Sequence, residues 1–301
     1  MKIPVASLPG DFYFRGMAVN EPTASAIMPP DLHIHTPFSR HASGSMEETV
    51  EAAVRKGFAE IGFADHFYYP DDYVEPAPDC VIPDRNAFEQ YVLEIERLQV
   101  RFRGRIAIRL GAEIDYIPDR MEDVRGELAR YPFDYLIGSI HAVNGVAFDY
   151  REDWLAARFD RLGGPEGLWK TYWRDMERFV SLDLFDIAGH FDLPKKFGIA
   201  RVDTDFSQPI GRVFDLMDRY RVAIEVNTGG IDRAANRETY PSMDLLRRAA
   251  ARGIAVAFGS DAHRPEDVGR YFSETSSLLR SEGVTQALTF VQREPRAVSI
   301  A

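Results

Sequence analysis

Residues 31–41 read DLHIHTPFSRH, a short apolar run of strand character that contains His33 and His35 and leads on to His41. Further runs of the same kind recur along the chain, as expected for buried strands. These runs are EIGFADH (60–66), IAIRLGAEIDY (106–116), YLIGSIHAV (135–143), LFDIAGHFD (184–192), VAIEVNTGG (222–230) and IAVAFGSDAH (254–263). Together they predict seven β-strands.

Longer segments with helical character separate these runs. The first, Ser45 to Lys56, begins with SMEE, in which Glu48 follows Ser45 at the spacing of a capping box, and it stops at Gly57. Further helices are predicted over residues 84–101, 119–130, 166–181, 207–220 and 241–252. Strands that alternate with helices indicate a parallel sheet covered by helices. Seven such units favour a single α/β domain over residues 31–301, a distorted TIM-like (βα)7 barrel.

Two kinds of segment fall outside this pattern. Residues 1–30 contain five prolines without a sustained periodicity, so we expect an N-terminal extended leader there. The long insertions at 67–83 and 144–164 follow the second and fourth strands and are rich in Pro, Gly, Asp and aromatic residues. We expect them to be active-site loops.

All seven histidines lie at or just beyond the ends of predicted strands. In a βα barrel these ends converge on one face, where such folds carry their active sites. His33 and His35 alternate along one strand, so both side chains leave the same face and can bind one ion. Glu113 and the pair Asp261 and His263 end two other strands. A single histidine is more often a core or surface residue, but burying this whole group without a cation is unfavourable. The pattern therefore predicts a metal site.

Composition narrows the function further. The net charge of −11 disfavours a DNA- or RNA-binding surface, which needs clustered Lys and Arg. Cys80 is the only cysteine, so the metal ligands must be nitrogen and oxygen atoms. No long apolar stretch or signal-peptide pattern is present, and we expect a cytoplasmic protein that does not bind membranes.

The motifs DLHIHTPFSRH, FADH, GAEIDY, GSIHAV, AGHFD and GSDAH resemble, in order, those of the polymerase and histidinol phosphatase (PHP) superfamily. The resemblance runs from Asp31 to about Phe272 and implies three divalent ions, which can be Zn, Mn or Fe by ligand type. The implied ligands are His33, His35, Glu113 and Asp261 for the first ion, Glu113, His141 and His190 for the second, and His41, His66 and His263 for the third. Asp65 is expected to support a ligand rather than to be one.

The resemblance also implies a mechanism. A hydroxide that bridges the first two ions would attack phosphorus, because coordination lowers the pKa of water. Asp261 would orient this hydroxide or carry a proton. The implied catalytic residues are Asp261, His263 and Glu113.

The stretches EVNTGGIDRAANRETYPS (225–242) and GSDAHRPEDVGRYF (259–272) are most similar to the histidinol phosphate phosphatases of this superfamily. This similarity implies hydrolysis of L-histidinol phosphate, a small phosphorylated substrate. Candidate phosphate contacts are Lys195, Lys196, Arg233 and Arg264, each of which can equally be a solvated surface charge. Two alternatives remain open at this stage: a PHP phosphoesterase acting on nucleotides or oligonucleotide ends, and a non-catalytic PHP domain.

Overall fold

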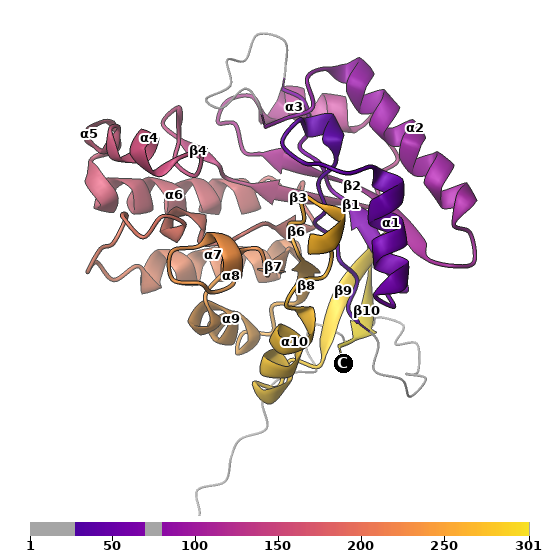
Figure 1. Cartoon of the computed structure of the whole chain (residues 1–301). Helices are drawn as coiled ribbons and strands as arrows, with labels where there is room; N and C mark the ends of the chain where they lie inside the picture. The colour runs from indigo at the N-terminus through magenta and orange to yellow at the C-terminus, as the bar shows by residue number, and fades with distance from the viewer. Residues whose placement is uncertain (1–27, 70–79, 301) are drawn as a thin grey trace, which may run out of the picture.

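The computed structural model describes residues 28–69 and 80–300, and its centre is a curled parallel sheet (Figure 1). All five strand pairings in this sheet are parallel. In spatial order the strands are β1 (Glu60–Phe63), β2 (Ala107–Asp115), β3 (Tyr135–Ser139), β6 (Ile187–Ala188), β7 (Ala223–Asn227) and β8 (Val256–Gly259). The order follows the chain, as it does in a βα barrel.

The predicted first strand, residues 31–35, closes this sheet into a ring. It forms isolated parallel bridges on both sides, Asp31 to Ile61 and Ile34 to Ala262. On one side the amide of Gly62 donates to the carbonyl of Asp31 at 2.8 Å, and on the other the amide of Leu32 donates to the carbonyl of Phe258 at 2.9 Å. The segment therefore joins β1 to β8, and the expected seven-stranded, distorted TIM-like barrel is confirmed, with its first member reduced to two bridges.

Helices surround the sheet (Figure 1). The longer ones are α1 (Met46–Arg55), α2 (Arg85–Arg101), α3 (Met121–Leu128), α6 (Gly164–Val180), α7 (Ser207–Tyr220), α9 (Met243–Ala250) and α10 (Phe272–Ser281). The predicted capping box begins α1, since Ser45 Oγ accepts from the amide of Glu48 and Glu48 Oε2 accepts from the amide of Ser45 at 2.7 Å. The short helices are η1 (Pro37–Ser39), α4 (Glu152–Ala156), α5 (Phe159–Leu162), η2 (Leu193–Lys195), α8 (Gly230–Arg233) and η3 (Pro265–Asp267).

The insertion at 144–164 is more regular than expected. It begins with the turn that joins β4 (Ala142–Val143) to β5 (Val146–Ala147), two strands that pair with each other, and α4 and α5 follow. The other predicted active-site loop, 67–83, lies outside the described residues between positions 70 and 79. The predicted leader likewise lies outside them, apart from residues 28–30.

A C-terminal hairpin, β9 (Gln286–Val291) with β10 (Glu294–Ser299), fills the end of the barrel where the strands begin. Leu288 and Phe290 are buried in one cluster with the barrel residues Tyr135 and Ile187. Arg293 fastens the hairpin there, since its Nε lies 2.5 Å from an oxygen of Asp186, immediately before β6. The opposite end of the barrel is thus left for the site. Among the described residues, no helix has the length and apolar character to cross a membrane.

Candidate metal centre

The carboxyl ends of the strands surround a cavity of about 170 Å³. It is lined by eight of the nine predicted ligands, namely His35, His41, His66, Glu113, His141, His190, Asp261 and His263. The ninth, His33, is fully buried behind His35. Two of these residues have left-handed backbone, Asp261 with φ of 52° and His190 with φ of 22°. Such conformations are costly outside glycine and cluster at functional sites.

Glu113 lies at the centre of the group, on β2, and is 1% exposed. Its Oε1 is 2.8 Å from Nε2 of His190 and 3.4 Å from Nε2 of His141. Its Oε2 is 3.3 Å from Nε2 of His33 and 3.2 Å from Nδ1 of His66. Each carboxylate oxygen therefore faces a different set of imidazoles, which is the arrangement that a ligand shared by two ions requires.

The rings of His33 and His35 face each other, with their Nε2 atoms 3.1 Å apart. On the far side of each ring, Nδ1 meets a carboxylate: Glu225 at 2.6 Å for His33 and Asp65 at 3.3 Å for His35. Because a carboxylate only accepts, both Nδ1 atoms carry hydrogen, and the Nε2 atoms are the ones that face each other and Glu113. The donor atoms therefore fit a divalent cation between them.

The electrostatics of this part of the site also call for positive charge. Against the effect of burial, Glu225 and Glu113 raise the pKa of His33, and Asp115 and Glu113 raise the pKa of His141 to about 10. Protons or metal cations can satisfy this requirement. Metal cations do so while leaving the imidazoles as lone-pair donors.

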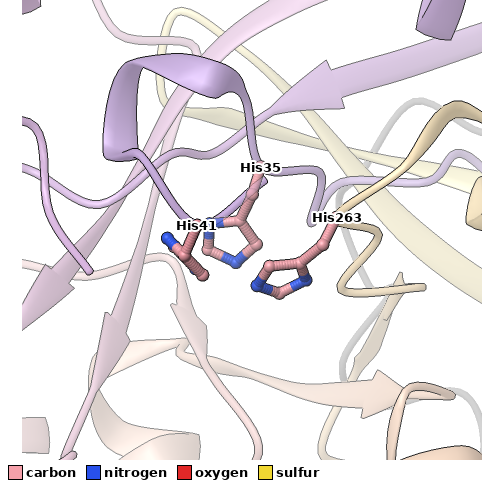
Figure 2. A group of neighbouring side chains, drawn as sticks. All are labelled: His35, His41 and His263. Atoms are coloured by element: carbon pink, nitrogen blue, oxygen red, sulfur yellow. The ribbon is translucent and has the colours of Figure 1, made fainter. Parts of the chain in front are cut away.

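A third group of donor atoms lies nearer the opening, where the rings of His35, His41 and His263 come together (Figure 2). The predicted third set contained His66 in place of His35. The His66 ring centroid lies 5.2 Å from that of His41, but the donor atoms within mutual reach are those of His35, His41 and His263. Burial lowers the pKa of His66 to about 3 and also lowers that of His41, so both are neutral imidazoles able to donate a lone pair.

Three carboxylates, two of them buried and that of Asp115 partly buried, hold the histidines in position. Asp65 holds His35, as expected. Two further carboxylates were not predicted from the sequence: Glu225, which holds His33, and Asp115, whose Oδ1 lies 2.5 Å from Nδ1 of His141. Such partners fix the tautomer and orientation of a ligating histidine. The available signal was alternation along a strand, since Asp115 follows Glu113 by two residues and lies on the same face.

The four predicted phosphate contacts separate into two pairs. Arg233 and Lys196 line the cavity, where Arg233 forms an ion pair with Asp261. Lys195 does not line it, and its Nζ instead lies 2.9 Å from both Asp192 and Glu238. Arg264 is likewise outside the cavity, and its Nε donates to Asp267 at 3.1 Å. The structure therefore brings only Arg233 and Lys196 to the site.

Comparisons with known proteins identify the family of the chain. The chain matches the PHP domain family over residues 31–229 and a family described as PHP-associated over residues 245–288. A probable histidinol-phosphatase of Deinococcus radiodurans is 36% identical, over 88% of this chain and 97% of the relative. Histidinol-phosphatase of Bacillus subtilis is 30% identical, over 79% of this chain and 95% of the relative.

A solved structure shares the fold. Histidinol phosphate phosphatase from Lactococcus lactis, crystallised in complex with Zn, L-histidinol and phosphate, superposes with a TM-score of 0.75. The match covers 90% of this chain and 99% of that chain at 20% identity.

Proposed function

The chain belongs to the PHP domain family, and from this membership we propose that it is a metal-dependent phosphatase that hydrolyses L-histidinol phosphate to L-histidinol and phosphate. Relatives named histidinol-phosphatase match it over nearly their whole length. The observation that carries the proposal is Glu113, whose two oxygens face separate sets of histidines at the centre of the cavity.

The cofactors we propose are three divalent ions of Zn, Mn or Fe. His33, His35, Glu113 and Asp261 would hold the first, and Glu113, His141 and His190 the second. For the third we propose His41, His66 and His263, with His35 close to the same position. When bound, such ions lower the pKa of a coordinated water and neutralise phosphoryl oxygens.

The protein's own residues prepare the cavity for a phosphoryl group. Asp261 is held by Arg233 and by the side-chain amide of Asn227, whose Nδ2 donates to it at 3.1 Å. It lies 3.3 Å from Nε2 of His35, where it can orient an attacking water. Arg233 also approaches His263, with Nη1 3.5 Å from Nδ1. Its planar guanidinium can donate two hydrogen bonds to phosphoryl oxygens.

The rest of the cavity suits a small leaving group that carries positive charge. Asp149 and Tyr150, from the insertion at 144–164, line it together with Asp115. The Asp149 carboxylate lies 3.3 Å from Nζ of Lys196, so the two charges partly compensate each other. Histidinol carries an amino group and an imidazole, which acidic side chains can bind. A small metabolite as substrate and a lone cysteine also suit the cytoplasm, which we propose as the compartment of this enzyme.

A kinetic panel on metal-reconstituted enzyme tests the proposal. We expect kcat/KM for L-histidinol phosphate to exceed that for nucleoside monophosphates and for an aryl phosphate. If the aryl ester were hydrolysed as efficiently as histidinol phosphate, the substrate assignment would be wrong and a general phosphatase would remain. Elemental analysis showing fewer than two ions per fully active chain would contradict the three-ion site.

A further inference from the structure

Tyr240 has a buried hydroxyl for which the fold supplies no partner. The residue is 1% exposed, and its Oη makes no hydrogen bond within the described part of the chain. The other fully buried tyrosines described in the structure differ in this respect. Tyr91 donates to the carbonyl of Gly111 at 2.9 Å, Tyr135 to that of Leu32 at 2.6 Å and Tyr172 to that of Phe191 at 3.0 Å. A buried hydroxyl left unpaired destabilises a protein and needs an explanation.

The position of Tyr240 gives that explanation, because the residue lines the same cavity as the histidines. Its ring centroid lies 6.5 Å from that of His190. The charged groups that act on its hydroxyl include Arg233, Asp261 and Asp149, which also line this cavity. Burial raises the pKa of the hydroxyl, so it remains a neutral O–H donor across the physiological range.

The ring of Tyr240 is held in position, although its hydroxyl has no hydrogen-bond partner among the described residues. The backbone of Tyr240 pairs with that of Asn227 at the end of β7, with N···O distances of 2.8 and 2.9 Å. Nζ of Lys195 lies 5.2 Å from the ring centroid, within cation–π range. The hydroxyl is therefore a donor fixed in place before any ligand binds, which reduces the entropy lost on binding.

The neighbouring guanidinium decides which part of the substrate this donor meets. Arg233 lines the same cavity as Tyr240, and both side chains pack against one turn. A Cβ at Gly229 would collide with Nη2 of Arg233, and a Cβ at Gly230 would lie 3.0 Å from Cδ2 of Tyr240. An ammonium or imidazolium group bound there would be repelled by Arg233, whereas a phosphoryl oxygen would be attracted by it and could accept from both residues. We propose that Tyr240 donates a hydrogen bond from its hydroxyl to a phosphoryl oxygen of the substrate. This inference rests on the proposed phosphatase function.

The variant Tyr240→Phe tests it by removing only the hydroxyl. We expect kcat/KM to fall about 10- to 100-fold, the range for a hydrogen bond to a charged group, and to fall equally for histidinol phosphate and an aryl phosphate. Inhibition by inorganic phosphate should weaken in parallel. The melting temperature should be equal to or above that of the wild type, because an unpaired buried hydroxyl is lost. A merely structural role would not produce this combination.

Tyr131→Phe is the matched control, since it also removes a buried hydroxyl but one that lies outside this cavity. Its kinetics should equal those of the wild type. Metal content per chain should be the same in the wild type and both variants.

Unchanged kcat/KM in Tyr240→Phe would overturn the proposal. A loss of kcat/KM confined to histidinol phosphate would also overturn it, because the hydroxyl would then contact the leaving group. If the wild type hydrolysed only the aryl ester, the proposed substrate would be wrong, while the aryl-ester and phosphate measurements would still decide the role of Tyr240.

Discussion

Glu225 supports two predicted metal ligands at once, and replacing it by glutamine separates its two roles. It is 1% exposed, its Oε1 accepts from Nδ1 of His33 at 2.6 Å, and its Oε2 accepts from the amide of His190 at 2.6 Å. Gly259 leaves the space for it, because a Cβ at that position would collide with its carboxylate. Glutamine has a single acceptor oxygen, so in Glu225→Gln an NH2 group must face one of the two donors.

Either orientation of the glutamine weakens the site. If NH2 faces His33, the ring must take its hydrogen on Nε2, the atom that faces His35 and Glu113, and it ceases to be a ligand. If NH2 faces the amide of His190, a buried N–H is left unpaired, at a cost of about 1–3 kcal/mol. Loss of such a supporting contact lowers metal affinity about 10- to 100-fold. This range corresponds to about 1.4–2.8 kcal/mol.

The measurement is metal affinity itself, by competition with a chelator and elemental analysis of the bound ions. Glu177→Gln is the control, because Glu177 also accepts hydrogen bonds, from Arg212, but on the outer surface of the barrel. Activity of Glu225→Gln should rise toward the wild-type value as metal is added in excess. Wild-type metal affinity in Glu225→Gln would refute the view that this carboxylate orients His33.

Three further predictions concern metal, phosphate and folding. Removing metal with a chelator should lower the melting temperature reversibly, since ions at 100 times their Kd stabilise by about 2.7 kcal/mol; an unchanged melting curve would contradict a structural contribution. Steady-state kinetics should show that Arg233→Lys lowers kcat/KM about tenfold or more by losing the two-pronged contact, whereas Arg264→Ala stays within about twofold. Phe290→Ala should lower the free energy of unfolding, measured by urea denaturation, by about 3–5 kcal/mol. A smaller decrease would mean that the hairpin contributes little to the core.

Much of the fold could be predicted because its signals are local. The capping box at Ser45, the glycine stop at Gly57 and the apolar runs each depend on a few adjacent residues. The C-terminal hairpin was not predicted, because β10 contains Pro295 among charged residues and reads as a loop. Proline is nevertheless compatible with an edge strand, and this hairpin forms a separate two-stranded sheet.

The candidate site was likewise predictable from the sequence only in part. The positions of the histidines follow from the rule that parallel strands end on one face, so the sequence could bring them together. The directions of side chains beyond the strand ends depend on turns, which periodicity does not describe. Lys195 and Lys196 are adjacent in sequence, yet only Lys196 reaches the cavity. The pairing of Glu225 with His33 connects two strands through side chains alone, and no local sequence pattern predicts it.

The closure of the ring by residues 31–35 has a consequence for biosynthesis. The side chain of Asp31 is bound by Ser260, 229 positions later, so this part of the barrel is completed only after the intervening residues have been made. Contacts of such high sequence separation form slowly, because a long loop must be closed first. His33 and His35 leave the ribosome early, but the partners that complete their environment leave it late. Metal capture at this pair should therefore follow the synthesis of β8, and we expect nascent chains that end before β8 to retain no ion there.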